Sequence, residues 1–249
     1  MVRAPVDSTS PFDGRIKSII RFIIMETSRL FGVRIEKLED TRYFWRDESS
    51  LMPDLQMHLR STPGMISLRR GMYLYWLAFA SGSGDIIEIG SWQGRSTIAL
   101  AQACSDAKNG KVHAIDNFEG NSGTEKQYVI NSEDLSDLKE NFLLNIDRAG
   151  LSKFVKLYSM SSSEAADIVS KTVDSIRMIY IDGEHTYDAV KQDLDCYAPL
   201  LSKGGIIAFD DYSPRFDGVK RAIDEHLAAN KDTYCRPVQD SNLLVLKKV

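Results

Sequence analysis

The chain has 249 residues, of which 43% are hydrophobic, and this length and composition suit one α/β domain with an appendage better than two complete domains. A formal net charge of -4 excludes the strongly basic surface that neutralises nucleic-acid phosphates, so we expect no nucleic acid as a substrate or partner. The three cysteines form no C-x-x-C motif, so neither a disulfide framework nor a zinc site is expected.

The first 64 residues predict an arm and a cap. Isoleucines recur at helical spacing over residues 15–31 with a few basic side chains among them, which indicates an amphipathic helix packed on its own domain or on a partner subunit rather than on a membrane. This helix and the aromatic cluster at 43–45 expose more apolar surface than one core is expected to bury, so we expect a homodimer. No signal peptide or run of 18 apolar residues is found, so we expect a soluble cytoplasmic protein.

Residues 85–97 form the stretch around which the chain is organised. An apolar run with β-branched residues meets a glycine turn and then a helical pattern, which predicts a strand, a tight loop and a helix start. The spacing E-x-G-x-x-x-G differs from the G-x-G-x-x-G that wraps a dinucleotide pyrophosphate. A ligand with an amino acid at one end and a nucleoside at the other fits better. The residues expected to hold it here are Glu88, Gly90, Ser91 and Ser96.

The next elements predict the nucleoside end of this site. A helix at 65–79 precedes the organising strand, and a second strand at 111–117 carries Asp116, placed where a carboxylate accepts the two ribose hydroxyls. A polar segment at 119–133 suits a substrate lid. After a third strand at 154–158, Ser162 belongs to a serine run that caps a helix or meets an adenine edge.

The remaining elements complete a seven-stranded sheet. They are a helix at 134–149, a strand at 177–182, a helix at 187–201, a strand at 204–210, a helix at 218–230, and strands at 234–239 and 242–247. Strands that alternate with helices predict a doubly wound, mostly parallel α/β sheet. A turn joins the last two strands, so we expect the final strand to run antiparallel to the others.

Two strand ends carry a second group of chemical residues, Asp182 after the fourth strand and Asp210 and Asp211 after the fifth. Three carboxylates that meet without a basic partner would repel one another unless a cation lay among them. Hard oxygen ligands favour Mg²⁺ or a similar divalent ion. His185 follows Asp182 by three residues, and we expect it to remove the proton from a bound hydroxyl, with helix capping as the alternative.

These motifs resemble known enzymes. Residues 85–97 resemble motif I of the class I methyltransferases that use S-adenosylmethionine (SAM), and the D-G-x-H and D-D pairs resemble the metal-dependent O-methyltransferases that modify sugars of macrolide and aminocoumarin natural products. The resemblance covers residues 65–249, taken as the methyltransferase domain, and it implies a Rossmann-like fold. By resemblance, Asp182, Asp210 and Asp211 hold the metal, His185 is the base, and Glu88, Gly90, Ser91 and Asp116 line the SAM site.

The sequence therefore predicts a SAM- and Mg²⁺-dependent O-methyltransferase acting on a hydroxyl of a small glycosylated or polyhydroxylated molecule. Three alternatives stay open: a metal-independent methyltransferase of another small acceptor, a nicotinamide-dependent oxidoreductase, and a catalytically idle SAM-fold module that binds a partner. The missing G-x-G-x-x-G disfavours the oxidoreductase. The acidic residues disfavour the idle module, since unpaired buried carboxylates destabilise a fold.

Overall fold

The computed structural model describes residues 52–120 and 137–249. The chain divides into two compact units, Met1–Pro53 and Asp54–Val249, and all but the first two described residues belong to the second. The helix predicted at 15–31, the aromatic cluster at 43–45 and most of the lid segment lie outside the described residues. Within the described part of the chain, no helix is long and apolar enough to cross a membrane.

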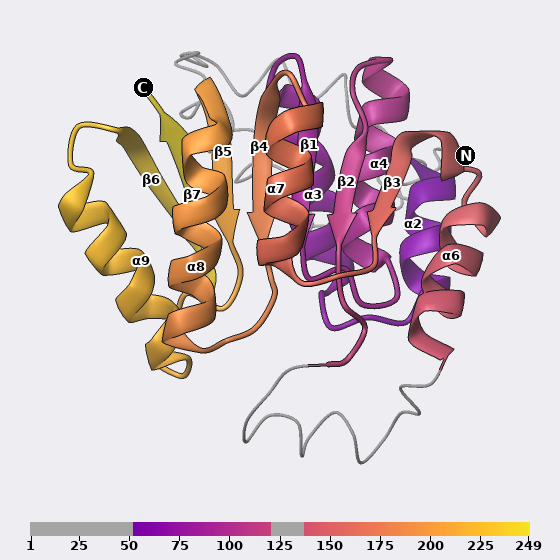
Figure 1. Cartoon of the computed structure of the whole chain (residues 1–249). Coiled ribbons are helices and arrows are strands. Elements are labelled where there is room, and N and C mark those ends of the chain that lie inside the picture. The colour runs from indigo at the N-terminus through magenta and orange to yellow at the C-terminus, as the bar shows by residue number, and fades with distance from the viewer. Residues whose placement is uncertain (1–51, 121–136) are drawn as a thin grey trace, which may run out of the picture. The chain divides into compact units, whose positions relative to one another are not determined.

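The second unit alternates strands and helices (Figure 1). The helices are α2 (Pro53–Ser61), α3 (Leu68–Ala80), α4 (Arg95–Ala107), α6 (Leu138–Arg148), α7 (Ser162–Thr172), α8 (Tyr187–Tyr197) and α9 (Asp217–Ala229). The strands are β1 (Asp85–Ile89), β2 (Val112–Ile115), β3 (Val155–Tyr158), β4 (Ile176–Ile181), β5 (Leu201–Phe209), β6 (Tyr234–Asp240) and β7 (Leu243–Lys248).

The seven strands form one sheet in the order β3-β2-β1-β4-β5-β7-β6. The first five are parallel, β7 runs antiparallel to β5, and β6 runs antiparallel to β7. This confirms the predicted doubly wound sheet with an antiparallel final strand. Every residue of β2 and β4 is buried, because strands covered on both faces need apolar side chains on both sides.

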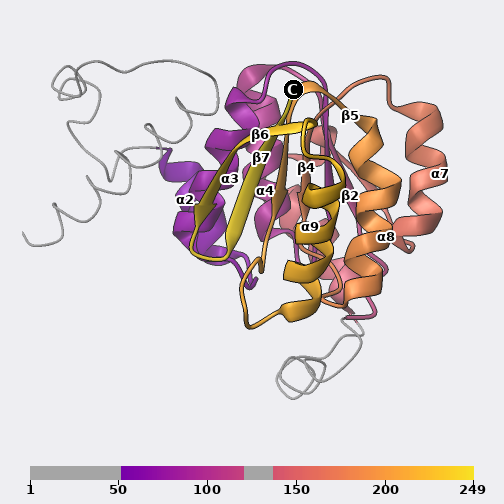
Figure 2. The same ribbon diagram turned by 90° about the vertical axis from the view of Figure 1, so that its left-hand side faces the viewer.

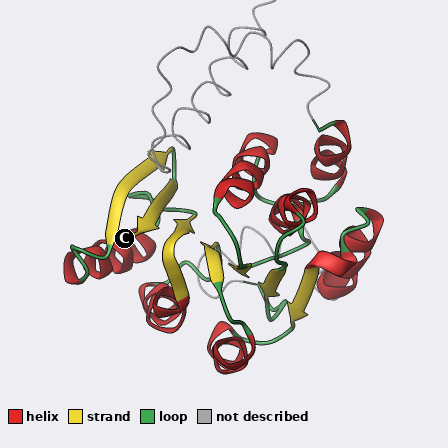
Figure 3. Cartoon of the chain, turned by 90° about the horizontal axis from the view of Figure 1, so that it is seen from above, coloured by secondary structure: helices red, strands yellow, loops and turns green. Residues whose placement is uncertain are grey.

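Helices cover both faces of the sheet. Figure 2 looks onto the β6 edge and separates α2 and α3 on one side from α7 and α8 on the other, and Figure 3 shows the strands between two layers of helices. Helix α3 begins where the Ser67 side chain accepts a hydrogen bond from the Arg70 amide. Helix α2 buries Leu55 and Leu59 and so belongs to the same compact unit as the residues that follow position 64.

Most predicted boundaries agree with the structure, and the junction of α8 with β5 is an exception. Helix α8 ends at Tyr197 rather than Leu201, and β5 begins at Leu201 rather than Gly204. A single 3-10 turn, Ala198–Leu200, separates them; Pro199 lies within it and lacks the amide proton that an α-helix interior needs. The pairing of β4 with β5 is irregular between Ile176 and Met178, where the early part of β5 joins the sheet.

The ends of the parallel strands place Gly90 and three aspartates along one rim. The last ladder hydrogen bonds run from the Gly90 amide to Ile115, from Asp116 to Tyr158, from Asp182 to Ile89, and from Asp210 to Ile181. Residues far apart in sequence therefore follow adjacent strands at the same edge. This is the edge at which open α/β sheets bind ligands.

Candidate functional site

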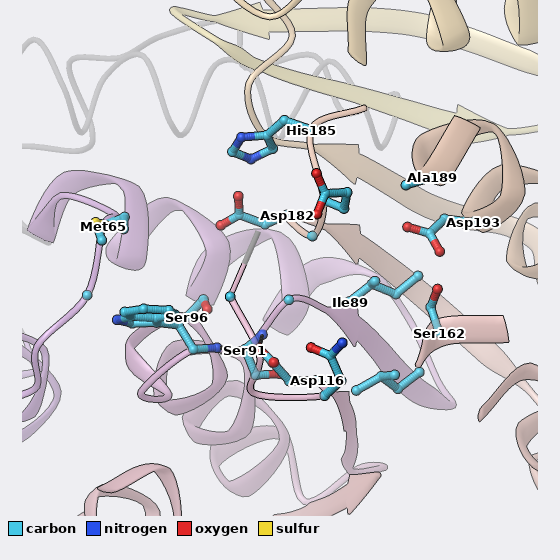
Figure 4. A pocket seen from close by; sticks show the side chains of 18 of the residues that line it. Met65, Ile89, Ser91, Ser96, Asp116, Ser162, Asp182, His185, Ala189 and Asp193 are labelled. Atoms are coloured by element: carbon cyan, nitrogen blue, oxygen red, sulfur yellow. Dashed lines mark hydrogen bonds between the residues drawn. The ribbon is translucent and has the colours of Figure 1, made fainter. Parts of the chain in front are cut away.

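A cavity of about 320 Å³ lies along this rim. Five of the six residues expected to bind the cofactor line it: Gly90, Ser91, Ser96, Asp116 and Ser162. The cavity wall also includes Asp182, His185 and Asp211. Figure 4 shows Ser91 and Asp116 on one side of the cavity, with Asp182 and His185 across from them. The glycine loop and the acidic residues therefore face a single space.

The loop after β1 depends on its two glycines. Gly90 has a φ of 85°, and a Cβ there would lie 2.0 Å from the Asp182 carbonyl oxygen, which only glycine avoids. Gly94 has a φ of 91° and precedes α4. Its missing side chain makes room for Phe142 and Ile146 of α6, so this glycine serves helix packing beside the loop.

Glu88 lies beneath the loop, fully buried within β1 and not in the cavity wall. One carboxylate oxygen accepts hydrogen bonds from the hydroxyls of Ser91, at 3.0 Å, and Thr97. Burial raises the pKa of Glu88 to about 7; the hydroxyl donors oppose this effect and Asp116 adds to it. Glu88 thus holds the loop hydroxyls from behind the cavity wall, and its direct part in SAM binding stays a prediction.

Asp116 also fixes the loop. One of its oxygens accepts hydrogen bonds from the amides of Ser91 and Trp92, each at 2.8 Å, and the other accepts from the Phe118 amide at 2.7 Å. Trp92 has a φ of 48°, a conformation that these bonds to Asp116 help to stabilise. Binding of a ribose by Asp116 stays a prediction.

The third side of the cavity comes from α7 and α8. Ser161 caps α7 through a capping box with Glu164, so the neighbouring Ser162 is left to line the cavity. Figure 4 shows Ser162 beside Asp193. Burial raises the pKa of Asp193 to about 6, although a hydrogen bond from Ser162 lowers it in part. No sequence pattern pointed to Asp193, which lies in the middle of α8.

Asp182, His185 and Asp211 form the acidic side of the cavity. One potential ligand atom of each lies within 4.8 Å of the others, and His185 Nε2 is 3.1 Å from Asp211 Oδ2. Burial and the charges of Asp210 and Asp211 raise the pKa of Asp182 well above its usual range. Burial alone would also raise the pKa of Asp211, but His185 holds it below the usual range. The alternative helix-capping role of His185 is wrong, because Thr186 caps α8.

Asp210 has partners that the sequence did not reveal. Its Oδ1 lies 2.6 Å from Arg70 Nη1 and its Oδ2 accepts from the Tyr180 hydroxyl at 2.8 Å. The expectation that three carboxylates meet without a basic partner is therefore wrong. Arg70 lies on α3, 140 residues before Asp210, and no local pattern could have connected them. Whether Asp210 binds a metal stays a prediction.

A second cavity, of about 360 Å³, lies on the other side of the acidic residues. It shares Met65, Ile66, Asp182 and Asp211 with the first cavity. The rest of its described wall comes from the residue before α3 and the start of that helix, from the end of β5 and from the β6–β7 turn: Ser67, Arg69, Arg70, Asp210, Asp240, Ser241 and Asn242. Among the residues that the structure describes, no aromatic side chain lines this cavity, and most of the lining groups are charged or polar.

Solved structures of low sequence identity share this fold. The O-methyltransferase NovP is 17% identical with a TM-score of 0.62, over 93% of this chain and 99% of that one. A Bacillus cereus O-methyltransferase in complex with SAH is 20% identical with a TM-score of 0.57, over 84% and 94%. CalS11, a TDP-rhamnose 3'-O-methyltransferase, is 18% identical with a TM-score of 0.50, over 96% and 95%.

Sequence relatives include two uncharacterized proteins. Protein y4gI of Sinorhizobium fredii is 24% identical over 157 residues, which is 61% of this chain and 16% of y4gI. Protein R132 of Acanthamoeba polyphaga mimivirus is 28% identical over 127 residues, 51% of this chain and 50% of R132. The chain thus spans half or less of the length of these relatives. A family described as a methyltransferase domain matches residues 87–212, from the glycine loop through the acidic rim and over half of the chain, and the chain belongs to this methyltransferase family.

Proposed function

We propose that the chain is a SAM- and divalent-cation-dependent O-methyltransferase that methylates a hydroxyl of a small glycosylated or polyhydroxylated molecule. One observation carries this proposal: the cavity that begins at the glycine loop ends at Asp182, His185 and Asp211. A methyl donor held by the loop would therefore point toward groups that bind and deprotonate a hydroxyl. Family membership and the folds of the O-methyltransferases support the same reaction.

The loop side of the cavity fits SAM. Gly90 keeps the loop free of a side chain next to Asp182, and Ser91 and Ser96 line the cavity where the carboxylate and the ammonium of SAM would lie. In this proposal Asp116 binds the ribose, and Ser162 with Asp193 binds the adenine. Bound SAM would supply a methyl group on a positively charged sulfur.

The acidic side fits a divalent cation. Asp182 and Asp211 offer hard oxygen atoms that lie within 4.8 Å of each other and of the His185 imidazole, which in this proposal is the base and not a ligand. A bound cation would lower the pKa of an acceptor hydroxyl. The described wall of the second cavity is mostly polar and has no aromatic ring, which suits the rest of a polyhydroxylated acceptor better than a flat phenol.

His185 is the base in the proposed reaction. It removes the hydroxyl proton through its imidazole while Asp211, 3.1 Å away, stabilises the resulting imidazolium. The hydroxyl oxygen forms a bond to the methyl carbon as the carbon–sulfur bond breaks, and the sulfur leaves without its positive charge. Asp182 and Asp211 orient the acceptor from the shared wall of the two cavities.

Calorimetry of the full chain tests the proposal against its alternatives. We expect SAM and S-adenosylhomocysteine to bind and NAD not to bind, with Mg²⁺ required for methyl transfer to a polyol or glycoside panel. Excess chelator should abolish transfer while S-adenosylhomocysteine stays bound. Full activity in chelator would favour the metal-independent methyltransferase. Binding of the cofactor without transfer to any oxygen or nitrogen acceptor would favour the idle module.

A further inference from the structure

The guanidinium of Arg70 connects both carboxylates of the candidate cation site. Arg70 lies near the start of α3, and only 11% of its side chain is exposed. Its Nη1 donates to Asp210, while its Nη2 donates to the Asn242 side-chain oxygen at 2.9 Å and contacts the Asp240 carbonyl at 3.4 Å. The planar guanidinium thus donates to two side chains, Asp210 and Asn242, in fixed directions.

Two hydrogen-bonded paths, here called arms, lead from Arg70 to the acids of the cation site. The first arm leads to Asp182. Asp210 accepts from Arg70 at one oxygen and from the Tyr180 hydroxyl at the other, and this hydroxyl lies 3.0 Å from Asp182 Oδ2. Tyr180 is fully buried on β4, so its hydroxyl has one position. The side-chain contacts from Arg70 through Asp210 and Tyr180 therefore hold one oxygen of Asp182 in place.

The second arm leads to Asp211. The Asn242 amide that accepts from Arg70 donates to Asp211 Oδ1 at 2.7 Å. The Asn242 carbonyl also accepts from the Tyr212 amide at 2.8 Å, which ties the β6–β7 turn to the end of β5. Asp211 has a φ of 56°, and these bonds hold its backbone and one carboxylate oxygen in place. The other oxygen faces His185.

We propose that Arg70 is the positioning residue of the cation site, which orients Asp182 through Asp210 and Tyr180, and Asp211 through Asn242. The inference rests on the proposed function, because it concerns the cation of that site. Arg70 also neutralises Asp210, so Asp210 supports the site from behind while Asp182 and Asp211 face the cation. Residues behind metal ligands commonly change metal affinity about 10- to 100-fold when they are replaced.

Mn²⁺ binding to the full chain, measured from the electron paramagnetic resonance signal of free Mn²⁺, tests this role without an activity assay. We expect Arg70→Met to weaken Mn²⁺ binding about 10- to 100-fold and Arg70→Lys to restore part of the loss. Arg69→Met is the matched control for cation affinity. Arg69 is the neighbouring arginine, 45% exposed and paired with Asp240 outside both arms, so Mn²⁺ binding should stay unchanged there.

Two variants cut one arm each and keep the test valid if Arg70→Met fails to fold. Tyr180→Phe removes the hydroxyl between Asp210 and Asp182, and Asn242→Ala removes the link to Asp211. We expect each to weaken Mn²⁺ binding by part of the Arg70 effect, with S-adenosylhomocysteine affinity unchanged. In the Arg70→Met background, Asn242→Ala should add less than it does alone, since the arm is already cut.

The outcomes separate this inference from the proposed function. Wild-type Mn²⁺ affinity in a folded Arg70→Met chain, or in both single-arm variants, overturns the positioning role. Tighter Mn²⁺ binding by Arg70→Met also overturns it, because a released Asp210 would then be a ligand that Arg70 had restrained. A wild-type chain that binds S-adenosylhomocysteine but no Mn²⁺ rejects the cation of the proposed function, and the inference with it.

Discussion

Replacement of Glu88 by glutamine tests the electrostatics beneath the glycine loop. The folded chain raises the Glu88 pKa from 4.5 to about 7, chiefly by burial. The folded state therefore binds this proton more tightly than the unfolded chain does. Stability from this group is present below pH 4.5 and is lost as pH rises through about 7. Glutamine resembles the protonated acid in shape and does not ionise, so this pH dependence should disappear.

The magnitude follows from the pKa values. One pKa unit corresponds to about 1.4 kcal/mol, so the displacement from 4.5 to about 7 amounts to about 3.4 kcal/mol over the whole titration. Between pH 5 and pH 8 the free energy of unfolding should fall by about 2.5 kcal/mol more in the wild type than in Glu88→Gln. Other titrating groups are common to both chains and cancel in this difference.

Urea unfolding at several pH values between 5 and 8 measures the effect. Asp193→Asn is the matched comparison, since the buried Asp193 carboxyl has its pKa raised from 3.8 to about 6. Most of the stability that this group contributes is lost by pH 6. Between pH 5 and pH 8 the free energy of unfolding should therefore fall by only about 1.4 kcal/mol more in the wild type than in Asp193→Asn. Equal pH dependence in the wild type and in Glu88→Gln would refute the reasoning, because Glu88 would then ionise in the folded chain as readily as in water.

Three further predictions address the proposed function. Asp116→Ala should weaken S-adenosylhomocysteine binding by about 1 to 3 kcal/mol, the cost of lost hydrogen bonds to a charged group; unchanged affinity by calorimetry would place the ribose elsewhere. His185→Ala should lower turnover by about two to four orders of magnitude, with cofactor affinity retained and no rescue by Mg²⁺. Removal of residues 1–35 should convert a dimer to a monomer in light scattering, and a monomeric mass for both forms would contradict the dimer.

The sequence predicted those parts of the site that depend on neighbouring residues. The loop from Glu88 to Gly94 follows from an apolar strand that meets glycines, and both glycines have positive φ values. The acids after β4 and β5 were placed correctly at one rim, because parallel strands end at the same edge of a sheet. The mostly parallel sheet and its antiparallel last strand follow from the alternation of strands with helices and from one short turn.

The contacts of Asp210 could not be predicted, because they join segments far apart in sequence. Arg70 precedes its partners Asp210 and Asn242 by 140 and 172 residues. Within a helix, an arginine gives no signal that distinguishes a solvent-exposed residue from one buried against an acid. The contact of Tyr180 with Asp182 is easier to predict from the sequence, because residues two apart on a strand share a face of the sheet.

The two cavities share four wall residues, Met65, Ile66, Asp182 and Asp211, of which only the two acids are titratable. Asp182 and Asp211 face both cavities, whereas the glycine loop lines the first, and Arg69, Ser241 and Asn242 line the second. In the proposed reaction, the acceptor oxygen and the methyl carbon meet at the shared acids. Substitutions that reshape the second cavity can therefore change which acceptor binds without altering the groups that hold SAM. The same separation places Arg70 on the acceptor side, where it orients the acids without contact to the glycine loop.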